Sequence, residues 1–397
     1  MAPVSHPLPT VVLVLAAALG PFAMHLLVPA IPSLVADLAV PYGTAQLVVS
    51  VYLVGFSLAQ LAYGPLSDRY GRRPLLLAGV GLFLVATAIS TFARSIEALL
   101  VARALQAVGG VAGMVLSRAI VADCFGRDRA AAMLGYITTA IVICSLASPT
   151  AGGFLSSGWG WRAGFAALLP PAAFVLLVVH FRLPETNLTP HKSLSLTNLT
   201  RAYGALLRQR LFLAPALALA LSSASWFAFV ASMPFVVVSL LGRPASDYGL
   251  MIALVSVGYI IGNFLSGRFS VRFGTWRMMM AGIVVMTAAA VLVPVGALLA
   301  PTSLLALFLP MMLMVLGGGL FMPNATATAI TSGAHNIGAA SGLIGFIQMS
   351  LSAVVTVAVG LLHDGTLMPM VIIVTGCTLA ATAVMIGPLR RHLAGET

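Results

Sequence analysis

Charge is scarce in this sequence. Only 7% of its 397 residues are charged and 60% are hydrophobic, whereas an ordinary soluble domain has roughly 25% charged residues. A water-soluble fold of this composition would lack a polar surface. The composition therefore excludes a soluble globular protein and predicts one that lives in a lipid bilayer.

Residues for covalent or metal chemistry are also few. The three cysteines, Cys124, Cys144 and Cys377, have no short pair spacing, so neither a disulfide framework nor a metal site follows. The sequence has no His-Glu-x-x-His motif and no pair of carboxylates at a catalytic spacing. These gaps argue against a membrane-embedded enzyme, and no cofactor is expected. Because there is no nucleotide-binding motif either, any work that the protein performs would draw its energy from a gradient.

Long apolar runs dominate what is present. A helix needs about 20 apolar residues to span a bilayer, and twelve such stretches occur, centred near Ala18, Gly55, Leu84, Val111, Ile141, Pro171, Phe227, Ser256, Val285, Met312, Val354 and Thr378. The sequence therefore predicts an all-α integral membrane protein with twelve transmembrane helices. We expect an N-terminal six-helix bundle at 1–181, a cytoplasmic linker loop at 182–210 and a C-terminal six-helix bundle at 211–397.

A short pattern occurs once in each half of the chain. Residues 64–74 read Gly-Pro-Leu-Ser-Asp-Arg-Tyr-Gly-Arg-Arg-Pro, and residues 267–274 read Gly-Arg-Phe-Ser-Val-Arg-Phe-Gly. The offset, 267 − 64 = 203 residues, is close to half of the 397-residue chain. Such duplication is typical of transporters built from internal repeats.

The basic residues predict the orientation. With both termini on one side, that side receives sixteen Lys and Arg residues and the other side three. The positive-inside rule then places both termini in the cytoplasm, and the net charge of +11 is a topology signal rather than a nucleic-acid site. The sixteen are Arg69, Arg72, Arg73, Arg118, Arg127, Arg129, Arg182, Lys192, Arg201, Arg208, Arg210, Arg268, Arg272, Arg277, Arg390 and Arg391, and the three are Arg94, Arg162 and Arg243.

Three motifs resemble those of a known family. Residues 64–74 match the loop between helices 2 and 3 of the major facilitator superfamily, and 103–110 (Arg-Ala-Leu-Gln-Ala-Val-Gly-Gly) look like its proton-coupling helix 4 motif. Residues 148–153 (Ser-Pro-Thr-Ala-Gly-Gly) are similar to its antiporter signature, with Ser148 in place of the usual glycine. The chain resembles most the twelve-helix drug:proton antiporters of the Bcr/CflA type. The resemblance implies two pseudo-symmetric six-helix bundles, the bacterial inner membrane, a monomer, and Pro149, Gly152 and Gly153 as the antiporter motif.

The loop motif predicts a cytoplasmic gate. Glycines 64 and 71 allow close backbone approach and a tight turn, while Asp68 can pair with an arginine. The resemblance implies that such contacts hold the gate shut in the outward-facing state; alternatively, the arginines only set topology. Because Val271 stands where the first copy has Asp68, we expect no equivalent latch in the second half. The expected gate residues are Gly64, Asp68, Arg69, Gly71, Arg72, Arg73 and Asp123.

Arg103 lies inside the fourth expected helix. An unpaired guanidinium there costs at least about 2.5 to 3.5 kcal/mol, so acceptors must offset it. Gln106, three residues later, lies on the same helix face and can supply one. By resemblance, Arg103 takes part in proton coupling or organises the central cavity. The alternative is an arginine that extends to the outer interface.

All nine Asp and Glu residues fall in expected loops or at helix ends, and none falls in the middle of an expected helix. The resemblance indicates that relatives commonly carry Asp at the helix 1 position that His25 occupies here. Since histidine titrates near neutral pH, His25 is the candidate proton carrier; a packing role is the alternative.

A cavity without a carboxylate favours uncharged cargo. A permanent cation would find no countercharge, whereas a neutral or zwitterionic amphipathic molecule would lose little on desolvation. We therefore expect export of neutral antibiotics of the phenicol or bicyclomycin sort, or of a metabolite, in exchange for protons. A passive facilitator or a proton symporter on the same fold is the alternative. Possible cavity residues are Tyr52, Trp226, Phe229, Tyr259, Asn324, Phe346 and Gln348.

Overall fold

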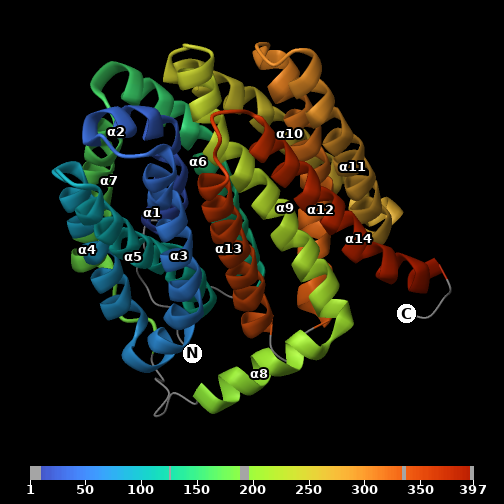
Figure 1. Cartoon of the computed structure of the whole chain (residues 1–397). Coiled ribbons are helices and arrows are strands. Elements are labelled where there is room, and N and C mark those ends of the chain that lie inside the picture. The colour runs from blue at the N-terminus through green and yellow to red at the C-terminus, as the bar shows by residue number, and fades with distance from the viewer. Residues whose placement is uncertain (1–9, 125–126, 188–195, 333–336, 394–397) are drawn as a thin grey trace. The chain divides into compact units, whose positions relative to one another are not determined.

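A computed structural model describes residues 10–124, 127–187, 196–332 and 337–393. Within these ranges the regular structure is entirely helical, and twelve stretches are long and apolar enough to cross a membrane. The predicted all-α membrane fold is confirmed. The chain divides into two compact units, 1–194 and 195–397, so the boundary falls inside the expected linker (Figure 1).

Unit 1 begins with a helix that proline interrupts. Its elements are α1 (Thr10–Leu26), the 3-10 turn η1 (Val28–Ala30), α2 (Ile31–Leu38), α3 (Tyr42–Tyr70), α4 (Arg72–Thr91), α5 (Ile96–Cys124), α6 (Arg127–Trp159) and α7 (Arg162–Arg182). Pro29 and Pro32 stand in the first turns of η1 and α2. Because proline donates no backbone hydrogen bond, each of these residues removes one bond from the helix where α1 gives way to η1 and α2.

Unit 2 contains a further helix that the hydropathy of the sequence does not predict. Its elements are α8 (Leu196–Arg208), α9 (Arg210–Pro234), the π-helical turn η2 (Phe235–Leu240), α10 (Ala245–Phe273), α11 (Thr275–Leu299), α12 (Leu304–Ser332), α13 (Ile337–Leu361) and α14 (Met368–Leu393). The extra helix is α8, within the expected loop 182–210. It packs on α9 and α13 and runs across the end of α13 (Figure 1).

The helix contacts repeat between the units. In unit 1, α5 packs on α3 and α4, and α1 packs on α6. In unit 2, α12 packs on α10 and α11, and α9 packs on α13. Gly71 (φ 95°) and Gly274 (φ 83°) make the equivalent breaks between α3 and α4 and between α10 and α11. The duplicated sequence pattern thus marks two copies of one packing arrangement.

Candidate functional site

A clasp of charged residues joins the ends of α3 and α5 to the start of α4. The guanidinium of Arg72 contacts Asp68 Oδ1 at 2.5 Å and Asp123 Oδ2 at 3.1 Å. It also donates to the hydroxyl of Ser67. One arginine therefore ties together the ends of three helices, and we call Asp68, Arg72 and Asp123 the ionic clasp.

Glu185, which follows α7, caps the first turn of α4. Its two carboxylate oxygens accept the backbone N–H groups of Arg72 (2.9 Å) and Arg73 (3.1 Å). A negative charge at a helix N-terminus is favourable because the backbone donors there have no helical partners. Gly71 has a φ of 95°, a backbone conformation that favours glycine, and a Cβ there would press against Glu185 Oε2.

The segment after α7 also reaches the ionic clasp. Thr186 donates its hydroxyl to Asp123 Oδ2 at 3.2 Å, and the amide of Asn187 donates to the carbonyl of Asp68 at 2.9 Å. The sequence does not predict the contacts of this segment, because Glu185 appears in it only as a carboxylate in the expected linker loop. By contrast, Gly64 has open space where a Cβ would stand, so the close approach expected at that glycine is absent.

A second site lies inside unit 1 around Arg103 of α5, which is completely buried. Its Nη1 donates to Gln106 Oε1 at 2.6 Å and to the carbonyl of Ala23 at 3.3 Å, and its Nε donates to the carbonyl of Val48 at 3.3 Å. The guanidinium carbon stands 4.0 Å from the ring centroid of Tyr52. Nη2 has no hydrogen-bond partner among the described residues. Complete burial rules out an arginine that extends to the membrane surface.

Further hydrogen bonds fix the residues that contact Arg103. Gln106 donates its amide to the hydroxyl of Thr87 at 2.8 Å, and Thr87 donates to the carbonyl of Phe83 at 2.6 Å. Tyr52 donates its hydroxyl to the carbonyl of Gly20 at 2.8 Å. The guanidinium is therefore fixed by neutral acceptors and an aromatic face from α1, α3 and α5, and α4 supports Gln106 through Thr87. Its hydrogen-bond acceptors among the described residues are carbonyl oxygens of the backbone and of an amide side chain, and none is a carboxylate.

His25 lies on α1, two residues from the carbonyl that Arg103 contacts, and only 6% of its surface is exposed. The antiporter-type motif on α6 faces the same stretch of α1. A Cβ on Gly152 would collide with the carbonyl oxygen of Leu26. Glycine at this position thus lets the α6 backbone touch α1 next to His25.

In unit 2, three of the expected cavity residues meet where α9 packs on α13: Trp226 and Phe229 on α9, and Gln348 on α13. Gln348 on α13 donates its amide to the hydroxyl of Ser223 at 3.1 Å. Trp226, one turn further along α9, stacks on Phe229 with ring centroids 6.3 Å apart. Tyr259 on α10 and Phe346 on α13 are half-buried.

Asn324 takes a different place, at the repeat equivalent of the ionic clasp. Its amide donates to Ser266 at 2.8 Å, and its oxygen accepts from the hydroxyl of Ser270 at 3.0 Å. Val271 is 94% exposed. We call Ser266, Ser270 and Asn324 the neutral clasp, because these three residues link α10 to α12 through uncharged groups.

Comparisons with known proteins agree with this architecture. Residues 13–357 match the model of the Major Facilitator Superfamily. The chain belongs to the major facilitator superfamily. It is therefore a multi-pass membrane transporter and not an enzyme.

Named relatives in this superfamily extend along most of the chain. Multidrug resistance protein D of Escherichia coli (strain K12) is 30% identical over 85% of this chain and 84% of its own length. The bicyclomycin resistance protein homolog of Haemophilus influenzae is 26% identical over 90% of each chain. A crystal structure of a D-xylose-proton symporter superposes with a TM-score of 0.73 over 94% of this chain and 96% of that chain, at 17% identity, which shows the fold alone.

Proposed function

We propose that this transporter exports small amphipathic compounds, neutral or zwitterionic drugs or metabolites, in exchange for protons. The relatives named for multidrug and bicyclomycin resistance support drug export. The observation that carries the substrate class is the environment of Arg103. A buried guanidinium among neutral acceptors repels a cationic substrate and tolerates an uncharged one.

The position of the acidic residues supports the same class. In the described residues, every Asp or Glu inside a membrane span lies in its first or last turn. A cation deep in either unit would therefore have no carboxylate to replace its water. A neutral molecule with an apolar body avoids this cost.

His25 is the proposed proton carrier. Among the described buried residues of unit 1, it is the one whose unperturbed pKa is closest to neutral pH. The carbonyl of Ala23 links its helix to Arg103, and Gly152 sets α6 against the next turn of backbone. A change of charge at His25 would thus act directly on the contacts among α1, α5 and α6.

The excess of basic residues on one side supports cytoplasmic termini in a bacterial inner membrane. The transporter would work as a monomer by alternating access, with the ionic clasp as part of its cytoplasmic gate. The face formed by Ser223, Trp226 and Gln348 would contribute substrate contacts from unit 2.

Proton release from inverted membrane vesicles tests the proposal. Vesicles with an acidic interior receive a phenicol, bicyclomycin or a cationic dye, and the external pH is recorded. We expect neutral compounds to trigger proton release from wild type and not from His25→Gln. The matched control is His180→Gln, because His180 is an exposed histidine on α7.

Three outcomes would contradict parts of this proposal. Preferential response to the cationic dye would overturn the substrate class. Full activity of His25→Gln would remove the proton role of that residue. Substrate uptake without any proton movement would favour the second candidate, a facilitator, and uptake with protons moving in the same direction would favour a symporter.

A further inference from the structure

A long part of the chain carries positive charge and no negative charge. From Thr186 to Leu240 there is no Asp or Glu, whereas Lys192, Arg201, Arg208 and Arg210 are present. Helix α8 lies in this interval, directly before the membrane span that begins at Arg210. It therefore lies at a membrane surface, between two spans of the chain.

Helix α8 has two different sides. Leu206 is 4% exposed, while Arg201 and Arg208 are exposed. These arginines are seven residues apart, about two turns, so they lie on one side of the helix. Leu206 is five residues from Arg201 and two from Arg208, which places it on the opposite side. The helix packs on α9 and α13 and turns a cationic side outward.

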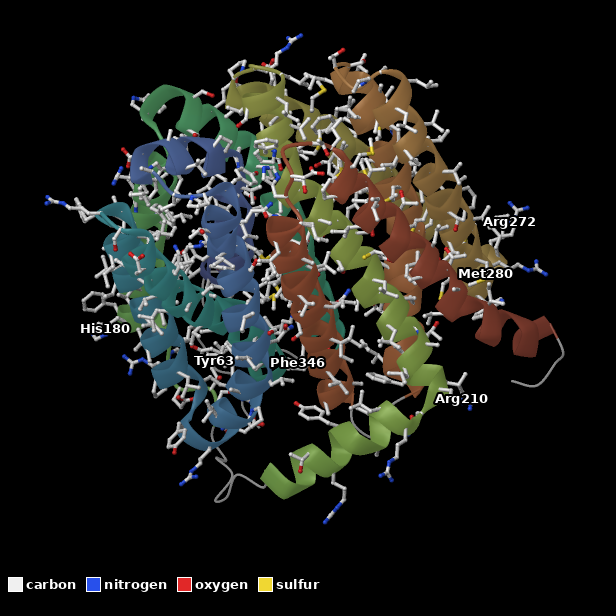
Figure 2. The ribbon with its side chains drawn as sticks, in the orientation of Figure 1. Tyr63, His180, Arg210, Arg272, Met280 and Phe346 are labelled. Carbon is white, nitrogen blue, oxygen red and sulfur yellow. The ribbon has the colours of Figure 1, made fainter. Side chains whose placement is uncertain are left out.

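The same end of unit 2 carries further arginines. Arg210 starts α9, Arg268 and Arg272 lie near the end of α10, and Arg277 lies in the first turn of α11; all four are exposed. Figure 2 shows Arg210 and Arg272 pointing away from the helices of unit 2. Among the described residues, none of these arginines, nor Arg201 or Arg208, forms an ion pair with a carboxylate.

Exposed apolar side chains stand beside these charges. Leu207 is 43% exposed next to Arg208, and Leu211 is 64% exposed next to Arg210. A soluble acidic peptide would match the arginines but leave the leucines in water. The boundary between lipid headgroups and acyl chains satisfies both, because it offers phosphates above an apolar layer.

We propose that α8 and the adjoining arginines bind the headgroups of anionic phospholipids. The guanidinium groups of Arg201, Arg208 and Arg210 donate to the phosphate oxygens, and Leu207 and Leu211 enter the acyl layer. Arginine suits this role because its planar donors contact two phosphate oxygens at once. The bound lipid would anchor the first turn of α9 to the membrane surface.

Lipid-dependent thermal stability of the purified full chain tests this inference. The unfolding temperature is measured in detergent with added phosphatidylglycerol, or with phosphatidylcholine of the same chain length. We expect phosphatidylglycerol to raise it more than phosphatidylcholine does. In Arg201→Gln/Arg208→Gln, phosphatidylglycerol should bind about fivefold more weakly for each arginine removed. The control is Arg94→Gln, an exposed arginine between α4 and α5 that lies outside this surface.

The outcomes distinguish a lipid site from a topology signal, a protein partner and a free anion. An anionic-lipid response that the double variant loses and Arg94→Gln retains would support the lipid site. Equal responses to the two lipids, or an unchanged response in the double variant, would overturn it and leave the arginines as topology signals. Polyglutamate that stabilises wild type when phosphatidylglycerol does not would also overturn it, in favour of an acidic protein partner. Stabilisation by inorganic phosphate alone, equal to that by phosphatidylglycerol, would overturn it in favour of a free anion.

Discussion

At the scale of single residues, Arg103 is expected to contribute to transport and not to folding stability. A buried guanidinium loses its hydrogen bonds to water, and neutral acceptors replace only some of them. Among the described residues, Nη2 of Arg103 has no hydrogen-bond partner. Replacement of a whole buried ion pair by apolar side chains of similar volume is often neutral or stabilising, and no carboxylate is among the described acceptors of Arg103 to offset its desolvation. A charge that persists at such a position is therefore better explained by transport than by folding.

We expect Arg103→Met to abolish proton-coupled export while the free energy of unfolding changes by no more than about 2 kcal/mol. Thermal unfolding and vesicle transport of the same preparation check this. Val115→Met on the same helix is the control, because Val115 is half-buried and outside the Arg103 network. A large loss of stability together with activity would mean that Arg103 is chiefly structural.

Asp364 provides a pH dependence outside the membrane spans. Its Oδ1 accepts the hydroxyl of Thr366 at 2.7 Å and the N–H of Thr366 at 2.9 Å, and these bonds lower the pKa of the carboxyl. Because the folded pKa is depressed, the stabilisation is present above the ordinary value of 3.8 and is lost as pH falls through the folded pKa.

As pH falls from 3.8 through the folded pKa of Asp364, we expect the unfolding temperature of wild type to fall more steeply than that of Asp364→Asn. Neutralising the side chain removes the titration, so the two pH profiles should converge at acidic pH. Thermal scans over a pH series provide the measurement. Parallel profiles for the two proteins would show that the turn does not contribute.

At the scale of elements, the first turn of α4 depends on a residue more than a hundred positions away. Glu185 accepts two of the backbone N–H groups that the helix itself leaves unsatisfied. We expect Glu185→Ala to lower the stability of unit 1 by about 1–2 kcal/mol, with Glu185→Gln between it and wild type. Thermal unfolding measures the order. Equal stability of all three would contradict a capping role.

Two adjacent glycines in α12 give a matched comparison. A Cβ on Gly317 would lie 2.7 Å from the carbonyl oxygen of Gly282 on α11, whereas Gly318 has open space around the same position. We expect Gly317→Ala to force α11 and α12 apart and destabilise the protein. Gly318→Ala should instead stabilise it by about 0.5–1 kcal/mol, because alanine favours the helix. Similar unfolding temperatures for both variants would refute the close packing of these helices.

The sequence predicts the elements better than their contacts. Twelve apolar stretches and the glycine breaks at 71 and 274 follow from hydropathy and local backbone preference, and the Arg103–Gln106 bond follows from helix geometry. The roles of Tyr52, Thr87 and Glu185 depend on contacts between distant segments, which spacing does not reveal. The sequence predicts a loop where α8 lies, because this helix, with two arginines and several polar residues, is too polar for a membrane span.

At the scale of the whole molecule, the two repeats join equivalent helices by different interactions, ionic in one unit and neutral in the other. Unit 1 uses the ionic clasp, whose Arg72–Asp123 contact is partly exposed, with side chains 13% and 26% accessible. Unit 2 uses the neutral clasp, in which Asn324 bonds Ser266 and Ser270. Screening by salt weakens partly exposed ion pairs and leaves neutral hydrogen bonds nearly unchanged.

This difference predicts that added sodium chloride destabilises unit 1 more than unit 2. Cys124 and Cys144 lie in unit 1 and Cys377 in unit 2, and all three are free and partly buried. A thiol-reactive dye therefore follows the unfolding of unit 1 in Cys377→Ser and that of unit 2 in Cys124→Ser/Cys144→Ser.

We expect Asp123→Asn to reduce the salt dependence reported by unit 1. Asn324→Ala should lower the stability of unit 2 by about 1–3 kcal/mol at every salt concentration, because it removes the uncharged hydrogen bonds that join Ser266 and Ser270 on α10 to α12. If salt shifted both reporters equally, and Asp123→Asn changed neither shift, the charge difference between the clasps would have no energetic consequence.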